Sequence, residues 1–275
     1  MNHLNEILEN LKKYILRLES CVVAFSGGVD STLLLTIAHE VLGDNCIAVI
    51  SITPSMSSQE ESFALSFVKE HSIPYQIVET KEFENEDFLK NDTNRCYFCK
   101  FELFKACHDI ADTKGFKHII DGSNADDVSD YRPGFKAAEE LQVLHPFIEC
   151  GLTKSDIREL SRTYNLPTSE KPASPCLASR VAYGSFITPE KLNMIDLAEQ
   201  YLRNQGFPVV RVRVHDEAIA RIEIPQDNFN RFHDLNFNDI VSHFKELGFS
   251  YVTFDLQGFR SGSSNEVVQK EVHKT

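Results

Sequence analysis

The sequence predicts an α/β domain built on a parallel sheet, followed by a smaller α+β domain. In the first part of the chain, short continuous apolar runs alternate with segments of helical periodicity. This alternation is typical of a parallel sheet with helices on both faces. Prolines then cluster between 167 and 175, where they favour extended chain, as a linker does. Beyond Thr188 the pattern changes to strands of alternating polarity between helices.

The first domain is expected to begin with a helix at 4–19, because leucine and isoleucine recur there on one helical face. The run at 20–25 is continuously apolar, as in a buried parallel strand. The alternation continues with a helix at 30–40, a strand at 46–52, a helix at 57–71, a strand at 75–79, a helix at 96–113, a strand at 118–122 and a helix at 153–164. The acidic segment 79–92 interrupts this order, and we expect it to form a solvated loop without a function.

The boundaries of the domains follow from the linker and from the change of pattern. We expect the sheet domain at 1–168, the α+β domain at 169–262 and a frayed tail at 263–275. The elements expected in the second domain are a helix at 188–205, strands at 209–214 and 219–224, helical stretches as far as Leu247, and a strand at 251–256.

Composition and charge exclude several functional classes. The 275 residues are 42% hydrophobic and 25% charged, as in a globular protein. A net charge of −13 disfavours a general nucleic-acid binder. The first twenty residues carry charges throughout, without the apolar core of a signal peptide, and no run of about 18 apolar residues suggests a membrane helix. We therefore expect a cytoplasmic protein, in a compartment where disulfides are rare.

The strongest local signal is Ser-Gly-Gly-Val-Asp-Ser-Thr at 26–32, between a buried strand and the start of a helix. Two glycines let the backbone turn tightly, and the unpaired N–H groups of the helix start attract an anion. The loop matches neither the Walker A pattern nor the dinucleotide pattern. Two glycines alone would indicate an ordinary tight turn, but the complete run is more specific.

This loop resembles the PP-loop of N-type ATP pyrophosphatases, which activate a carbonyl or carboxylate by transferring AMP to it. The resemblance implies that ATP binds, with Mg²⁺, at residues of this loop. The residues concerned are Ser26, Gly27, Gly28, Asp30, Ser31 and Thr32.

Three of the seven cysteines attract attention. Cys96 and Cys99 are spaced C-x-x-C at the start of a helix, so their sulfurs share one face. Cys176 lies in a loop, after Pro175 and before Ser179-Arg180. The other four cysteines have no partner spacing or lie in apolar strands, and small core residues are the better interpretation for them.

Spacing leaves three alternatives open for the three cysteines. A structural zinc site would need a fourth ligand, from another cysteine or a histidine. A redox dithiol would use Cys96 and Cys99 and leave Cys176 unexplained. Three thiolates on a four-iron cluster would leave one iron open for a further ligand such as sulfide.

Taken together, these motifs resemble the LarE family of ATP-dependent sulfurtransferases. The likeness spans about residues 20–262. The matching segments are 26–32, 130–134, the Cys176 loop to Arg180, 211–215, 220–223 and 255–262. These enzymes act on pyridinium-3,5-biscarboxylic acid mononucleotide, a precursor of the nickel-pincer cofactor.

The resemblance implies a chemistry for the cysteines. Some members carry only the cysteine that matches Cys176 and surrender its sulfur. Others also carry C-x-x-C and are thought to hold a four-iron, four-sulfur (4Fe-4S) cluster that delivers sulfide. This sequence has the three-cysteine pattern, which implies cluster ligands and catalytic residues at Cys96, Cys99 and Cys176.

The resemblance also implies the remaining site residues. The family's phosphate site for the nucleotide-like substrate matches Ser179, Arg211 and Arg213, and two arginines one residue apart project to the same face of a strand. Without the resemblance, a solvated strand face would be the preferred interpretation of these arginines. Asp127 and Asp130 are the candidate Mg²⁺ ligands within an acidic stretch at 121–130. A homo-oligomer is expected from the family, and the sulfide donor cannot be inferred.

Three other functions compete with this one. A cluster-dependent PP-loop tRNA thiolase would require a broad basic surface or an added RNA-binding domain, and the sequence shows neither. An amide-forming synthetase that uses ammonia gives no reason for three cysteines. A non-enzymatic zinc-binding module would leave the phosphate loop without a role.

Overall fold

The computed structural model describes residues 3–129, 133–172, 174–215 and 218–260. The chain divides into two compact units. The first unit consists of 1–53, 58–85 and 96–174, and the second of 54–57, 86–95 and 175–275. This division differs from the contiguous domains 1–168 and 169–262, because two short segments from the first part of the chain join the second unit. In the described parts of the chain, no helix combines the length and the apolar character needed to span a membrane.

The first unit is built on a parallel sheet of four strands in the order β3-β2-β1-β4. The strands are β1 (Cys21–Ala24), β2 (Cys46–Ser51), β3 (Tyr75–Val78) and β4 (His118–Ile120). The helices of this part of the chain are α1 (His3–Leu18), α2 (Val29–Leu42), α3 (Ser58–Glu70), α5 (Arg95–Lys114), α6 (Gly134–Glu140), α7 (Pro146–Glu149) and α8 (Lys154–Thr163). The predicted α/β class and its parallel sheet are confirmed.

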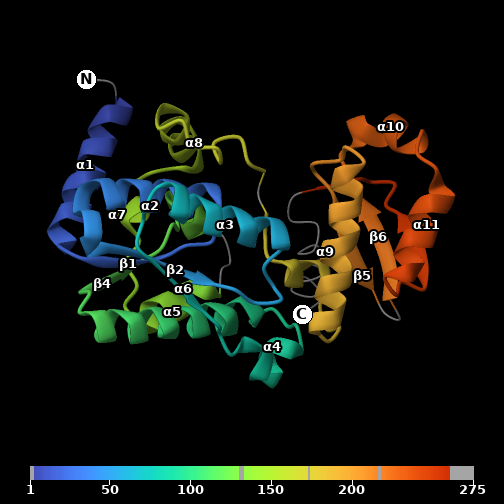
Figure 1. The fold of residues 1–275 in the computed structure, drawn as a ribbon, viewed down its shortest axis with the longest axis horizontal. Helices are drawn as coiled ribbons and strands as arrows, with labels where there is room; N and C mark the ends of the chain where they lie inside the picture. Colours follow the sequence, from blue (N-terminus) through green and yellow to red (C-terminus); the bar gives the residue numbers. More distant parts are fainter. Residues whose placement is uncertain (1–2, 130–132, 173, 216–217, 261–275) are drawn as a thin grey trace. The chain divides into compact units, whose positions relative to one another are not determined.

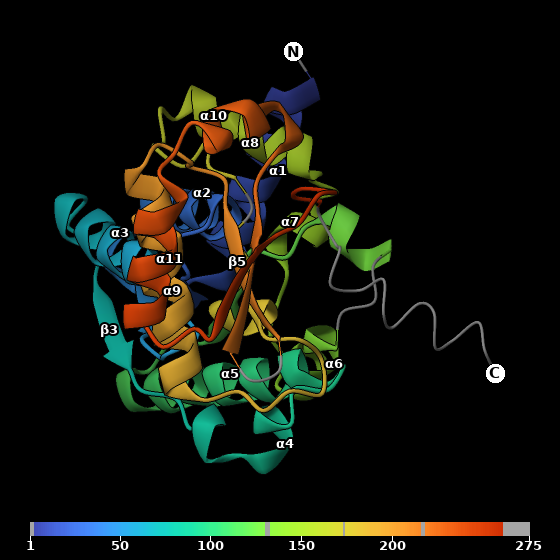
Figure 2. The ribbon, with the colours of Figure 1, turned by 90° about the vertical axis from the view of Figure 1, so that its right-hand side faces the viewer.

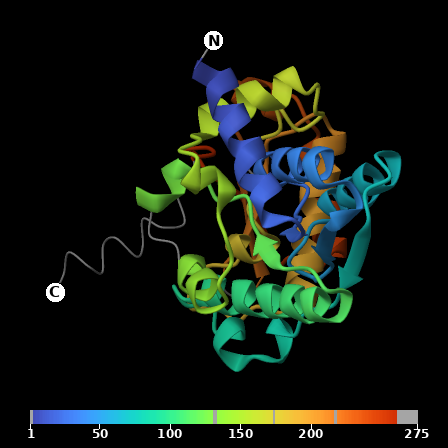
Figure 3. The same cartoon turned by 90° about the vertical axis from the view of Figure 1, so that its left-hand side faces the viewer.

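Helices cover both faces of this sheet (Figures 1 and 3). On one face, α5 and α6 pack through Phe104, Cys107 and Ala137 against apolar residues of β1 and β2. On the other face, α2 packs on β1 and β2 and contacts α1 and α8. The residues of β1 and β2 are almost completely buried, which explains the continuous apolar runs of the sequence. The loop that joins β1 to α2 lies at the carboxyl end of the central strands, where ligands bind in folds of this kind.

The second unit contains a three-stranded sheet in the order β5-β6-β7. The strands are β5 (Arg211–His215), β6 (Ile219–Glu223) and β7 (Tyr251–Phe254); β6 runs antiparallel to β5 and parallel to β7. The helices are α4 (Glu86–Leu89), α9 (Pro189–Asn204), α10 (Phe229–His233) and α11 (Phe237–Glu246). Figure 2 shows α9 and α11 along the same side of this sheet.

The two faces of the small sheet differ in character. Val212 lies opposite Ile222 and Val214 opposite Ala220, so these apolar residues share the face that packs on the helices. The other face pairs Arg211 with Glu223 and Arg213 with Arg221. Register therefore gathers the arginines of β5 and β6 on one charged face.

The acidic segment 79–92 is not the solvated loop that its charge predicts. Glu82 is 1% exposed, Phe88 is buried, and Asn91 is completely buried with its backbone in the left-handed region. The amide of Asn91 donates to the carbonyl oxygens of Val181 (3.1 Å) and Ala182 (2.8 Å). The prediction was wrong because a few residues of this acidic segment, such as Phe88 and Asn91, are buried. The overall charge of the segment does not reveal them.

The four cysteines interpreted as core residues differ in how deeply they are buried. Cys21, Cys46 and Cys107 are completely buried, whereas Cys150 is only half-buried. Cys21 and Cys46 are direct neighbours on β1 and β2, and the contact with Cys21, together with burial, raises the pKa of the Cys46 thiol far above its ordinary value. The Cys46 thiol is therefore held in its unreactive, protonated form.

Candidate functional site

The loop at 26–32 forms a compact cradle at the start of α2. Gly27 has φ +72°, and a Cβ at this position would lie 3.0 Å from the ring of Phe63. Gly28 caps α2 without a side-chain hydrogen bond, so the first amides of the helix have no capping side chain. The hydroxyls of Ser26 and Ser31 lie 3.1 Å apart inside this turn. The cradle has the backbone shape and the donors that suit an anion.

Thr32 differs from the other loop residues. It is completely buried, and its amide donates to the carbonyl oxygen of Gly28 (2.9 Å), which is the first bond of the helix. Thr32 therefore supports the loop from inside the protein, whereas Ser26 is exposed and Gly28 and Asp30 are half-buried.

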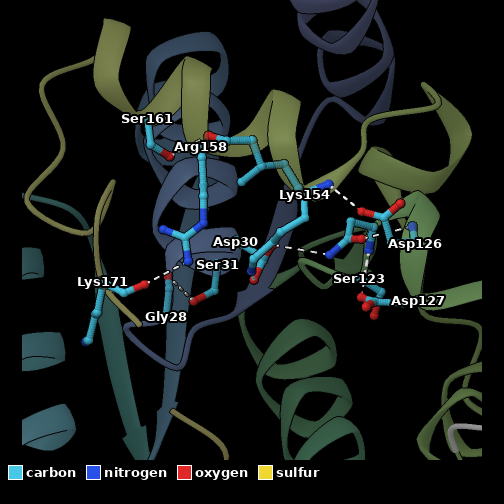
Figure 4. Close-up of polar contacts among 12 residues, drawn as sticks. Gly28, Asp30, Ser31, Ser123, Asp126, Asp127, Lys154, Arg158, Ser161 and Lys171 are labelled. Carbon is cyan, nitrogen blue, oxygen red and sulfur yellow. Dashed lines mark hydrogen bonds and ion pairs between the residues drawn. The ribbon is translucent and has the colours of Figure 1, made fainter. Parts of the chain in front are cut away.

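Three basic residues that the sequence analysis missed converge on the loop (Figure 4). Lys154, the first residue of α8, forms an ion pair with Asp30. Lys171 donates to the carbonyl oxygen of Gly27 (3.0 Å) and pairs with Glu60. Arg158 donates to the carbonyl oxygens of Ser169 and Lys171 and so holds that segment. The sequence contains one signal for Lys154: Thr153 and Asp156 form a capping box, which places Lys154 in the first turn of a helix.

The loop after β4 brings carboxylates to the same edge of the sheet. Asn124 donates to Asp30 (3.3 Å), and Asp126 accepts from the backbone amide of Lys154 (2.8 Å). Asp127 accepts from the amide of Asn124 (3.0 Å). Asp130, the other predicted Mg²⁺ ligand, lies outside the described residues.

Asp121 is the most constrained of these acids. It accepts from His145 (2.7 Å) and from the amide and hydroxyl of Ser123 (both 3.1 Å), and it pairs with Lys100 (3.3 Å). Burial alone would raise the pKa of Asp121, but the charge of Lys100 and the hydrogen bond from His145 outweigh it and hold the pKa well below its usual range. Both oxygens of Asp121 are therefore engaged by neighbouring groups.

The C-x-x-C pair lies in the first turn of α5. Cys96 is exposed and Cys99 is half-buried, three residues further along the same helical face. The side chain of Asp92 accepts from the amide of Asn94 (2.7 Å) and forms the turn that leads into the helix. Both thiols are therefore presented by a rigid element.

Cys176 is exposed and comes directly before a short 3₁₀ turn, Leu177–Arg180. Its carbonyl oxygen accepts from the amide (3.0 Å) and the hydroxyl (2.8 Å) of Ser179. Arg95, the residue before Cys96, donates to the carbonyl oxygen of Ala178 (3.0 Å). Arg95 therefore ties the peptide that leads into the C-x-x-C pair to the loop of Cys176.

Within the described ranges, no three histidine, cysteine or acidic side chains gather closely enough to hold a metal ion. Cys96 and Cys99 belong to the first unit and Cys176 to the second. Thiolates of this kind are the donor type that iron–sulfur clusters use.

The predicted substrate-phosphate residues come together on the charged face of the small sheet. Arg213 donates to the carbonyl oxygen of Ser179 (3.0 Å) and pairs with Glu223 (2.6 Å). Arg211 lies 5.4 Å from the ring centre of Phe259. Burial and the nearby charge of Arg180 lower the pKa of Arg211 to about 10.

The surroundings of these arginines are less positive than the sequence suggests. Counting residues 203–221 finds four arginines and two acids, but Glu199, Glu223 and Asp255 arrive from other elements. Glu199 pairs with Arg203, whereas Glu223 and Asp255 pair with Arg221. Glu199 and Glu223 lie just outside the counted range and Asp255 lies further along the chain, so the count over 203–221 overstates the positive charge.

The chain is similar in sequence to several known proteins. A family model described as NAD synthase matches residues 3–95. The chain is 41% identical over 264 residues to an uncharacterised protein of Synechocystis, covering 96% of this chain and 98% of the relative. It is 40% identical over 256 residues to the pyridinium-3,5-bisthiocarboxylic acid mononucleotide synthase of Lactiplantibacillus plantarum, covering 92% and 91%. The chain belongs to the LarE family.

Membership of the LarE family explains the more distant matches. One subunit of the glutamine-hydrolysing GMP synthase of Thermoplasma acidophilum is 27% identical over 217 residues, covering 73% of this chain and 67% of the relative. That likeness and the NAD synthase model reflect the PP-loop, whose family uses ATP with Mg²⁺. This LarE-family chain is thus an ATP-dependent enzyme, as its sequence predicts.

Proposed function

We propose that the protein is a sulfurtransferase that adenylates a carboxylate of pyridinium-3,5-biscarboxylic acid mononucleotide and inserts sulfur to give a thiocarboxylate, a step toward a nickel-pincer cofactor. The observation that carries this proposal is the 40% identity to the Lactiplantibacillus plantarum synthase, which extends over both units and includes the phosphate loop and the Cys176 loop. We further propose a cytoplasmic homo-oligomer.

The phosphate loop would hold the pyrophosphate portion of ATP. The amides at the start of α2 and the hydroxyls of Ser26 and Ser31 supply donors, and Lys154 and Lys171 add positive charge. In the structure, the ammonium group of Lys154 forms an ion pair with Asp30. If Mg²⁺ binds Asp30, this ammonium group becomes available to the phosphates. The negative charge that develops on the departing pyrophosphate is thereby neutralised by groups that are already in place.

The chemistry has two steps. A carboxylate oxygen of the substrate attacks the α-phosphorus of ATP, the bond to the bridging oxygen breaks, and pyrophosphate leaves with the electron pair. A sulfur nucleophile then attacks the carbonyl carbon of the acyl adenylate, and AMP leaves. Adenylation is needed because an oxide ion is a very poor leaving group and AMP is a good one.

The charged face of the small sheet would hold the substrate phosphate. Guanidinium groups match the geometry of phosphate oxygens, and Arg211 and Arg213 project from one side of β5. Ser179 lies against Arg213, three residues after Cys176. A phosphate held there would position the substrate beside the cysteine loop.

We also propose that Cys96, Cys99 and Cys176 bind a 4Fe-4S cluster. The support is the C-x-x-C pair on one turn of α5, the exposure of Cys176 and the hydrogen bond from Arg95 to Ala178. When bound, such a cluster would present an iron without a protein ligand, to which a sulfide can attach.

The function is tested by pyrophosphate release. Purified protein with Mg²⁺ and ATP is expected to release pyrophosphate when the pyridinium dicarboxylate mononucleotide is added, because adenylation requires its carboxylate. Mass spectrometry should detect the gain of sulfur in the product. Equal release with transfer RNA alone, and none with the mononucleotide, would favour an RNA thiolase instead.

The cluster is tested by metal analysis after anaerobic purification. The wild-type protein is expected to carry about four irons with matching sulfide and a brown absorption band. Cys96→Ser should remove most of the iron, because two thiolates hold a cluster poorly, whereas Cys150→Ser should keep it. A colourless protein with stoichiometric zinc would contradict the proposal.

A further inference from the structure

Arg180 is an unusual arginine. Its side chain is 1% exposed, and it is the largest of the fully buried side chains of this protein's described part. One nitrogen, Nη1, donates to the carbonyl oxygens of Pro175 and Cys176 (3.0 Å to the latter) and to the hydroxyl of Ser179 (3.1 Å). The guanidinium therefore gathers the backbone on both sides of Cys176.

Glu199 balances the charge of Arg180. Its carboxylate is completely buried in α9 and lies 3.0 Å from Nε of Arg180. The same carboxylate accepts from Arg203 (2.6 Å) and from the backbone amide of Val212 (3.1 Å). Val212 lies between the two arginines of β5 that carry the proposed phosphate site. One carboxylate thus joins the cysteine loop, a helix and β5.

A buried ion pair of this kind is not explained by stability alone. Removing two charges from water is costly, and well-packed apolar residues often serve a core as well or better. The pair is better explained by the geometry that it imposes. Arg180 binds main-chain oxygens and the hydroxyl of Ser179, while the residue that carries the thiol stays exposed.

We infer that Arg180 is a positioning residue: with Glu199 it fixes the backbone of Cys176 at a set place relative to Arg211 and Arg213. Sulfur transfer from or through Cys176 then occurs with the substrate phosphate held at a constant distance. This inference rests on the proposed function for the chemistry of Cys176, but the fixed backbone itself does not depend on it.

The test compares Arg180→Lys with Arg203→Lys. The first variant keeps a positive charge for Glu199 but lacks the planar group that reaches several oxygens at once. The second changes the other partner of Glu199 and leaves the cysteine loop untouched. Hydrogen exchange is measured by mass spectrometry on the peptide that contains the bonded amides of Leu177, Ser179 and Val181.

We expect exchange in this peptide to become at least about ten-fold faster in Arg180→Lys and to change less than about two-fold in Arg203→Lys. We also expect pyrophosphate release to persist, while the thiocarboxylate formed per pyrophosphate falls about ten-fold, because the adenylate hydrolyses before a misplaced cysteine reacts. Unchanged exchange in Arg180→Lys, or equal acceleration in both variants, would overturn the inference.

Two further arrangements keep the outcomes distinct. If Arg180→Lys does not fold, Glu199→Gln serves in its place, because the amide retains a hydrogen bond but not the charge. If the exchange responds as expected while the wild-type protein releases no pyrophosphate with the mononucleotide, the proposed function fails and the positioning role of Arg180 stands.

Discussion

Replacement of Cys176 by serine is expected to reduce thiocarboxylate formation by at least about 10³-fold, because the proposed cluster loses one of its three thiolate ligands. The backbone of this loop is held through carbonyl oxygens, so the substitution leaves the contacts of Ser179 and Arg180 in place. Pyrophosphate release should continue, because adenylation uses the phosphate loop of the other unit. Parallel assays of pyrophosphate and of product mass separate the two steps.

The matched control for this variant is Cys150→Ser, which changes another cysteine that is not fully buried. It should retain product formation within about two-fold, since surface substitutions away from a site have small effects. A Cys176→Ser protein that keeps more than a tenth of the product yield would show that the sulfur reaches the adenylate by another path. The mass of the wild-type protein after several turnovers reveals whether Cys176 itself surrenders its sulfur.

Replacement of Gly122 by valine is expected to weaken ATP binding about 100-fold, or about 2.8 kcal/mol. A Cβ on Gly122 would lie 3.0 Å from the backbone nitrogen of Ser31 and 3.1 Å from the carbonyl carbon of Asp30. Both atoms belong to the first turn of α2, where main-chain groups cannot yield as a flexible side chain can. The loop would have to shift by a fraction of an ångström, away from the place where its donors meet the phosphates.

Titration calorimetry with Mg²⁺ and ATP measures this effect, and Gly122→Ala should lie between the wild type and the valine variant. Gly115→Ala is the control. Gly115 has φ +78°, and a Cβ there would meet no atom of the described residues within 4 Å, so its substitution strains the backbone far from the phosphate loop. It should lower the melting temperature while ATP affinity stays unchanged. A Gly122→Val protein that is folded and binds ATP normally would contradict the assigned site.

Local sequence signals were enough to predict the parallel sheet. The apolar runs at 20–25 and 46–52 correspond to β1 and β2, since strands buried on both faces need no alternation. The small sheet was also predicted, although β5 begins at Arg211, two residues later than expected. The acidic segment 79–92 was mispredicted, because the burial of Asn91 depends on carbonyl oxygens about ninety residues away.

Sequence reasoning found the site residues that carry a local pattern and missed those that depend on the fold. The phosphate loop and the C-x-x-C pair are short runs with a recognisable chemistry. Lys154, Lys171 and Glu199 are single residues whose importance comes from distant partners, such as Asp30, Gly27 and Arg180. Pairings of this kind leave no trace in composition or periodicity.

The two units are interleaved along the chain, so a single cut cannot separate them intact. A single cut at 174 would leave the carboxyl-terminal fragment without 86–95, and therefore without the hydrogen bonds of Asn91 and Arg95 to the residues that follow Cys176. The small sheet therefore cannot be moved into another nucleotide-binding chain as one continuous segment while the cysteine loop keeps these hydrogen bonds. A rearrangement that preserves these hydrogen bonds must therefore keep segment 86–95 together with the part of the chain that follows residue 174.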